Sequence, residues 1–411
     1  MIRRLLTAAV WLSLLAAVAY AGESPQFRGP DRDGRFDEEG LMKAWPEGGP
    51  PVLWVAEGLG QGFSSASVTG GKIYVTGMNE DEDGYLSVLN LDGTVERKIL
   101  YGKDTTEKNA PGPRSTPTLD GDRLYLLSGL GTVYCIDLTK GEIMWPVDIL
   151  ERFNAKNIMW KLAESVLIDG DRLICTPGGE DASVVALNKM TGETVWTSKG
   201  LSDKASYCSA DIVEHNGRRL LLTETAKLVV GIDADTGAPL WTHDHPTNYL
   251  VHAVTPLYKD GLVYFTAGYG SGGGALELSP DGSASTVKWT DTNLDCQHHG
   301  VVLVDGCLYG TSQAKRGELM CLEMATGKLL WRTNEVRQGV TVFADGMLYV
   351  YEGAKSGIVN LVKAVPTGFE RTGQFTVTQG ANQHWAHPAI AGKRLYIRHG
   401  DALIAYDIAA K

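Results

Sequence analysis

The fold is predicted from one stretch of sequence, Cys135-Ile-Asp-Leu-Thr-Lys-Gly-Glu-Ile-Met-Trp145, whose pattern the chain repeats three more times. The repeats are Ala186-Leu-Asn-Lys-Met-Thr-Gly-Glu-Thr-Val-Trp196, Gly231-Ile-Asp-Ala-Asp-Thr-Gly-Ala-Pro-Leu-Trp241 and Cys321-Leu-Glu-Met-Ala-Thr-Gly-Lys-Leu-Leu-Trp331. In each, a glycine stands six places after the first residue and a tryptophan ten places after it. Trp289 continues the series, so neighbouring tryptophans lie 42 to 51 residues apart. A period of this length is typical of a β-propeller.

A second landmark recurs eight times and divides each repeat into strands. It is an apolar run such as Leu124-Tyr125-Leu126. Five of the eight runs are introduced by an Asp-Gly pair and one by an Asn-Gly pair, with one or two residues between the pair and the run. These pairs accept positive φ at both central positions and indicate tight hairpin turns. Each repeat therefore predicts four antiparallel strands, which is one propeller blade.

The count of blades depends on the two ends of the repeat region. The last repeat reaches Asp407 and lacks a fourth strand, whereas Val52-Leu53-Trp54-Val55 is a strand without a repeat of its own. Pairing residues 52–55 with residues 402–406 would remove two open sheet edges. We therefore predict an all-β, eight-bladed propeller over residues 51–411, with the N-terminal strand completing the last blade.

This repeat resembles the tryptophan-docking repeat of the quinoprotein-like (PQQ-like) propellers, which include BamB-like outer-membrane assembly proteins. The resemblance covers about residues 50–408. It implies that the tryptophans are structural and wedge between adjacent blades, with the glycine of Thr-Gly at positive φ. The six tryptophans given this structural role are Trp54, Trp145, Trp196, Trp241, Trp289 and Trp331.

The first 50 residues are not part of the repeat. Arg3 and Arg4, an apolar stretch from Leu5 to Val18 and the sequence Ala19-Tyr20-Ala21 predict a signal peptide over residues 1–21. The stretch of about 14 apolar residues is short for a membrane span, although an uncleaved anchor is the alternative. We expect a periplasmic or secreted protein without a lipid anchor, exported by either the Sec or the twin-arginine route. Residues 22–50 predict an irregular leader along the outside of the ring.

Charge and cysteine content exclude several classes of function. The net charge of −11 argues against a nucleic-acid partner. The six cysteines form no CxxC pair and no spacing typical of a zinc site, and most are expected to be buried free thiols. No segment after residue 21 is apolar enough to span a membrane, and the protein is expected to be a monomer.

Side chains that directly precede the innermost strands of a propeller converge at one end of its channel. Five of the nine histidines lie in these short segments. We therefore predict a site for a small polar or anionic ligand or a protein, with Arg114 as the main charge and aromatic rings as stacking surfaces. An alternative is that these groups only bind one another and the backbone. The predicted ligand-binding residues are Arg114, Trp160, Tyr207, His252, His298, His299, Trp385 and His387.

Two functions remain open. The first is a non-catalytic binding or scaffold propeller without a cofactor, catalytic residue or metal. The second, implied by the resemblance, is a dehydrogenase of alcohols or sugars that uses pyrroloquinoline quinone (PQQ) with calcium. Such enzymes carry a disulfide between adjacent cysteines, a calcium-binding Glu/Asn/Asp set and long covering loops. This chain has no Cys-Cys pair, and its repeats are short. The sequence therefore favours the binding propeller.

Overall fold

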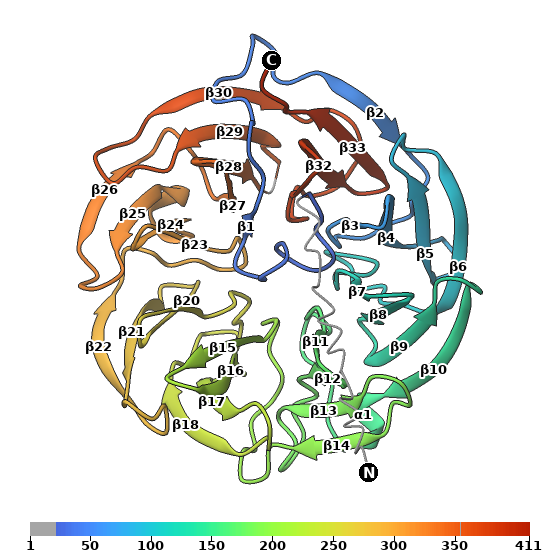
Figure 1. Cartoon of the computed structure of the whole chain (residues 1–411), viewed down its shortest axis with the longest axis vertical. Coiled ribbons are helices and arrows are strands. Elements are labelled where there is room, and N and C mark those ends of the chain that lie inside the picture. Colours follow the sequence, from blue (N-terminus) through green and yellow to red (C-terminus); the bar gives the residue numbers. More distant parts are fainter. Residues whose placement is uncertain (1–21, 354) are drawn as a thin grey trace, which may run out of the picture.

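Each sequence repeat folds into one antiparallel sheet of the computed structural model, which describes residues 22–353 and 355–411. Within these ranges the strands form eight sheets arranged around a central axis (Figure 1). The predicted all-β, eight-bladed propeller is therefore confirmed. The predicted signal peptide, residues 1–21, lies outside the described residues.

We number the blades in chain order from the strand nearest the axis. The innermost strands are β3 (Ser67–Thr69), β7 (Thr118–Asp120), β11 (Leu167–Asp169), β15 (Asp211–His215), β19 (Leu257–Lys259), β23 (Val302–Val304), β27 (Gly339–Ala344) and β31 (Ala389–Ala391). The second strands are β4 (Lys72–Met78), β8 (Arg123–Leu127), β12 (Arg172–Cys175), β16 (Arg218–Glu224), β20 (Leu262–Ala267), β24 (Cys307–Thr311), β28 (Met347–Glu352) and β32 (Arg394–His399).

The third strands are β5 (Asp83–Asn90), β9 (Thr132–Asp137), β13 (Val185–Asn188), β17 (Leu228–Asp233), β21 (Gly272–Leu278), β25 (Leu319–Glu323), β29 (Ile358–Lys363) and β33 (Ala402–Asp407). The outer strands are β6 (Val95–Lys103), β10 (Glu142–Asp148), β14 (Thr194–Thr197), β18 (Pro239–Asp244), β22 (Ser285–Asp291), β26 (Leu329–Thr333), β30 (Arg371–Thr376) and β2 (Val52–Ala56). Two short helices, α1 (Ile149–Arg152) and η1 (Ala314–Gly317), lie in connections.

The last blade takes its outer strand from the beginning of the repeat region. β2 pairs antiparallel with β33, in the register Val52 with Tyr406 and Val55 with Ile404. The pairing predicted for residues 52–55 and 402–406 is therefore confirmed. Because the two strands come from opposite ends of the repeat region, this pairing joins those ends in one sheet.

The repeated tryptophans and glycines meet across blade boundaries. A Cβ atom built on Gly237 of blade 4 would lie 2.4 Å from the ring of Trp196 of blade 3, and one on Gly192 of blade 3 would lie 3.0 Å from the ring of Trp145 of blade 2. Both glycines also have φ above +70°. Glycine is therefore required at these turns by the backbone conformation and by the ring of the preceding blade.

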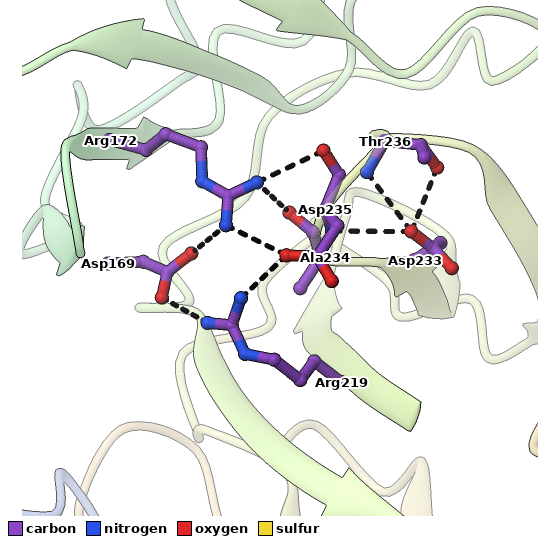
Figure 2. Close-up of polar contacts among 7 residues, drawn as sticks. All are labelled: Asp169, Arg172, Arg219, Asp233, Ala234, Asp235 and Thr236. Carbon is purple, nitrogen blue, oxygen red and sulfur yellow. Dashed lines mark hydrogen bonds and ion pairs between the residues drawn. The ribbon is translucent and has the colours of Figure 1, made fainter. Parts of the chain in front are cut away.

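The aspartate of the repeat has a structural role as well. Asp233 accepts hydrogen bonds from the backbone amides of Asp235 and Thr236 in the turn that follows β17 (Figure 2). In the same view, Arg172 and Arg219 both contact Asp169 and Asp235, so ion pairs link the hairpin turn of blade 3 to this turn of blade 4. Partly exposed ion pairs of this kind typically add no more than about 1 kcal/mol each to stability.

The leader does not run along the outside of the ring, so that expectation was wrong. Figure 1 shows it crossing the central axis, and its strand β1 (Arg35–Phe36) pairs in parallel with β27, the innermost strand of blade 7. Arg32 donates hydrogen bonds to the backbone carbonyls of Ser165, Val166 and Ala210, in blades 3 and 4. Buried arginines and single buried hydrophobic residues such as Phe36, Leu41 and Trp45 fix this segment. They follow no hydrophobic period, which is why the sequence pattern did not indicate the path of the leader.

All six cysteines are buried and free among the described residues. None of the helices in the described part of the chain is long and apolar enough to cross a membrane.

Candidate functional site

A cavity of about 1260 Å³ opens at the end of the propeller where the innermost strands begin. The connections that precede these strands supply residues to its wall from all eight blades. Examples, from blade 1 to blade 8, are Ser65, Arg114, Ala163, Tyr207, Ala253, His299, Gln338 and Trp385. The propeller therefore gathers into one concavity residues that are far apart in the sequence.

The leader separates this cavity from a smaller one on the same axis. Phe27 lines the large cavity, and its ring centroid lies 4.9 Å from that of His387. The neighbouring residues Gln26, Pro30 and Arg32 line a second cavity of about 540 Å³, together with Asp169 and Asp305 of the hairpin turns. The central channel is thus crossed by the leader, and the large cavity is a pocket with a floor.

The structure brings together seven of the eight residues predicted for the site. Lining the large cavity are Arg114, Trp160, Tyr207, His298, His299, Trp385 and His387. His252 is the exception, because its side chain is fully buried behind the wall formed by its neighbours Val251 and Ala253. Its place in the repeat was correctly aligned, but an irregular segment does not fix which way each side chain points. Ligand binding by the other seven stays a prediction.

Arg114 is held by the protein itself. Its guanidinium donates hydrogen bonds to the carbonyls of Trp160 and Ala110 and lies 3.6 Å from the carboxylate of Glu107. Burial lowers the pKa of Arg114, although the nearby carboxylate opposes this effect. Arg114 therefore joins the segments that carry Glu107 and Trp160, and an anion would compete with Glu107 for it.

Aromatic rings form much of the wall. The ring of Trp385 lies 5.5 Å from that of Phe63 and 5.6 Å from that of His298, between centroids. On the other side, the hydroxyl of Tyr207 accepts a hydrogen bond from the backbone amide of Trp160. Such rings offer large, rigid contact surfaces for a bound chain or ring.

Several lining residues were missed by the sequence analysis. When the repeats are aligned on their glycines, Ser64 of blade 1 falls at the position that Arg114 occupies in blade 2. Phe63 directly precedes Ser64, so including one more residue on that side would have found it. Tyr269 comes from the loop between β20 and β21, and Phe27 comes from the leader. Neither segment belongs to the repeated pattern, so the pattern does not predict its place. Both segments come close to the cavity only when the eight blades have closed into a ring.

The cavity histidines form a compact group. The rings of His298 and His299 lie 3.9 Å apart, whereas an extended backbone would send them to opposite faces. The segment is bent, and Gly300 follows with a φ of +71°. Burial lowers the pKa of His298 to about 4 and the pKa of His299 well below its usual value. Both imidazoles are therefore neutral at neutral pH.

The carboxylates at the cavity are also engaged. Glu107 accepts hydrogen bonds from the amides of Asn109 and Ala110, and Glu352 accepts from Ser356, Asn360 and the amide of Arg337. A general acid or base needs a pKa near the operating pH and access to its substrate. The neutral histidines and the engaged carboxylates favour binding over proton transfer.

Comparison with known proteins places this chain beside two groups of propellers. A family model described as "Outer membrane protein assembly factor BamB" matches residues 103–333. Outer membrane protein assembly factor BamB of Kangiella koreensis is 27% identical over 216 residues, which is 51% of this chain and 49% of that protein. Quinoprotein alcohol dehydrogenase PedH of Pseudomonas putida is 24% identical over 184 residues, 43% of this chain and 30% of that protein.

The chain therefore matches about half or less of the length of these curated relatives. Among solved structures, BamB from Moraxella catarrhalis superposes with a TM-score of 0.63 and 15% identity, covering 87% of this chain and 99% of that one. At this identity the likeness concerns the fold alone.

Proposed function

We propose that this chain, which belongs to the family of the outer membrane protein assembly factor BamB, is a non-catalytic scaffold that binds a protein segment in its central cavity. The observation that carries the proposal is a large cavity with a closed floor, aromatic walls and neutral histidines. Such a surface suits an extended, largely uncharged polypeptide with aromatic side chains. The names of the relatives suggest a protein that works in outer membrane protein assembly, and the signal peptide predicted from the sequence would place it in the periplasm.

The cavity supports a peptide better than a small anion. Arg114, its most buried cation, is already paired with Glu107, so binding an anion would require that pair to separate. In contrast, the rings of Trp385 and Phe63 line the cavity and are available for stacking. Aromatic anchors of this kind typically carry most of the energy of a protein interface.

The experiment is photocrosslinking in the native cell. A photoreactive residue at position 385, in the cavity, is compared with one at Val287, which is 50% exposed on the outer strand of blade 5. We expect position 385 to crosslink to an outer membrane protein or to its assembly machinery, identified by mass spectrometry. Equal crosslinking from both positions, or none from position 385, would refute the proposal.

The similarity to quinoprotein dehydrogenases makes a quinone-dependent oxidoreductase the second candidate. The residues present do not fit PQQ with calcium. Asn109 and Glu107 are a carboxamide and a carboxylate at the cavity, but the Arg114 guanidinium lies 3.6 Å from Glu107, where it would repel a cation. The six cysteines are buried, and no two are adjacent. Adding PQQ and calcium to the purified chain should therefore give no oxidation of alcohols or sugars with an artificial electron acceptor.

A further inference from the structure

Three buried side chains meet behind the wall of the cavity, at the connection between blades 4 and 5. Glu224 ends β16, His245 directly follows β18, and His252 lies in the segment before β19. Each offers one potential ligand atom, and these atoms lie within 4.8 Å of one another. The side chains of Glu224 and His252 have no exposed surface.

Most of the polar atoms in this cluster lack a partner. Both carboxylate oxygens of Glu224, both ring nitrogens of His245 and Nδ1 of His252 have no hydrogen bond of ordinary geometry among the described residues, although backbone groups of Thr266, Ser271, Gly272 and Thr225 lie near the three side chains. Native proteins leave few buried polar groups unpaired, and each one costs about 1–3 kcal/mol. Three such groups that face one another point to a shared partner outside the chain.

The remaining hydrogen bond suits a metal ligand. Nε2 of His252 lies 2.6 Å from the carbonyl oxygen of His245, so it carries the proton and donates it. The lone pair of the neutral ring is therefore on Nδ1, which has no hydrogen bond of ordinary geometry among the described residues, although the backbone of Thr225 lies near the ring and Nε2 lies 3.9 Å from Glu224. A ligating imidazole commonly donates its second nitrogen to a carbonyl in this way, which fixes the ring and its tautomer.

We propose that Glu224, His245 and His252 bind one divalent cation of the Zn²⁺ class. Two imidazoles and one carboxylate are typical Zn²⁺ ligands, whereas Ca²⁺ and Mg²⁺ prefer oxygen alone. Ligand atoms around tetrahedral Zn²⁺ lie about 3.3 Å apart, so modest side-chain rotations would close the set. Burial raises the pKa of Glu224 well above its usual value and lowers those of both histidines to about 4.

The cation would brace the candidate binding site. The carbonyl oxygen of His252 accepts hydrogen bonds from the amide of Tyr207, 2.9 Å away, and from the hydroxyl of Ser206. Tyr207 in turn holds Trp160 at the cavity wall. A metal bound to His252 would therefore fix the segment that positions the rings of Tyr207 and Trp160. This effect does not depend on what the cavity binds.

The test is metal binding by the full mature chain, refolded with and without equimolar Zn²⁺ because the cluster is buried. We expect one equivalent of Zn²⁺ by mass spectrometry and a higher Tm than that of the chelator-treated protein. Glu224→Gln keeps the shape of the side chain and should lower the affinity at least 10-fold. His243→Gln is the matched control, since His243 lies two residues from His245 and packs on the same Phe265 ring but is not one of the three clustered groups.

A second measurement does not depend on the variants. Co²⁺ bound to the wild type should give the visible absorption of a tetrahedral site with nitrogen and oxygen ligands. The proposal fails if the refolded wild type takes up no metal, if Co²⁺ shows octahedral absorption only, or if Glu224→Gln binds as tightly as His243→Gln. None of these readouts depends on a protein ligand in the cavity, so they test the metal site separately from the proposed function.

Discussion

The guanidinium Nη1 of Arg28 lies 3.3 Å from Nδ1 of His387, although 359 residues separate the two in sequence. Because an arginine can only donate, Nδ1 of His387 accepts this hydrogen bond. The proton of the neutral His387 ring is therefore on Nε2, which lies 3.0 Å from the carbonyl oxygen of His298. Burial, with the nearby positive charge of Arg28, lowers the pKa of His387 well below its usual value. The leader therefore fixes the tautomer of a cavity histidine.

Replacing Arg28 should release the leader. Its guanidinium also donates to the carbonyls of Asp33, Val301 and Thr341, and Arg28→Ala would leave these buried acceptors without a donor. We expect a loss of about 3 kcal/mol in the free energy of unfolding, since each orphaned acceptor costs about 1–3 kcal/mol. Denaturant unfolding measures this loss, and limited proteolysis should cut within residues 22–50.

The control for this experiment is Arg35→Ala. Arg35 is exposed in the same leader, with its guanidinium 5.6 Å from the ring of Phe343, so we expect a loss below about 1 kcal/mol. If both variants lose the same stability, Arg28 does not anchor the leader.

The docking of tryptophans on glycines predicts a difference between two alanine variants. Gly121→Ala and Gly237→Ala both place a side chain at positive φ, at +57° and +76°, and this conformation costs about 1–2 kcal/mol. Only at Gly237 would the new Cβ meet the ring of Trp196, whereas nothing lies within 4 Å of it at Gly121. We expect Gly237→Ala to be less stable than Gly121→Ala by a further 1–3 kcal/mol or so, the typical cost of overpacking. Thermal and denaturant unfolding compare them, and equal losses would show that the blade contact is unimportant.

Removing β2 should cause association. Deleting residues 1–56 leaves β33 without its outer partner and also removes Trp54, whose Nε1 donates to the carbonyl of Leu91 in blade 1. Exposed sheet edges pair readily with other chains. Light scattering after size-exclusion chromatography should detect oligomers or aggregates, with a chain lacking residues 1–50, which keeps β2 but not the leader, as the control. A deleted protein that stays monomeric with an unchanged Tm would contradict the role of β2.

Glu164 should make the stability depend on pH. Burial raises its pKa from 4.5 to about 7, although the backbone amide of Thr176 donates to it and Arg32 is nearby. Between these two pH values the folded chain holds a proton that the unfolded chain has lost. Stability therefore falls as the pH rises from 4.5 to 7 and is constant above that range. The contribution is about 3 kcal/mol for a shift of this size.

Glu164→Gln removes the ionisable group but keeps an oxygen for Thr176. The variant should match the wild type near pH 4 and be more stable at pH 8, by up to about 3 kcal/mol in the free energy of unfolding. Comparing each variant with the wild type at the same pH cancels the effects of the histidines. Glu180→Gln, at an exposed position of the same blade, is the control. Parallel curves for wild type and Glu164→Gln would refute the role of Glu164.

The eight-bladed fold could be predicted from local sequence patterns alone. The spacing of Trp145, Trp196 and Trp241, the Asp-Gly turns and the unmatched strand at Trp54 together predict four-stranded blades, their number and the strand that completes the last one. These features are local, because a turn or a strand pattern depends on residues close together in the chain.

The path of the leader and the directions of the side chains around the cavity could be seen only in the tertiary structure. Arg28 and Arg32 reach backbone carbonyls of distant blades, and carbonyl acceptors leave no trace in the sequence. His252 and His299 were aligned at corresponding places in their repeats, yet one is buried beside Glu224 and the other lines the cavity. In irregular segments no period fixes the direction of a side chain, so the site depends on contacts that exist only once the ring has closed.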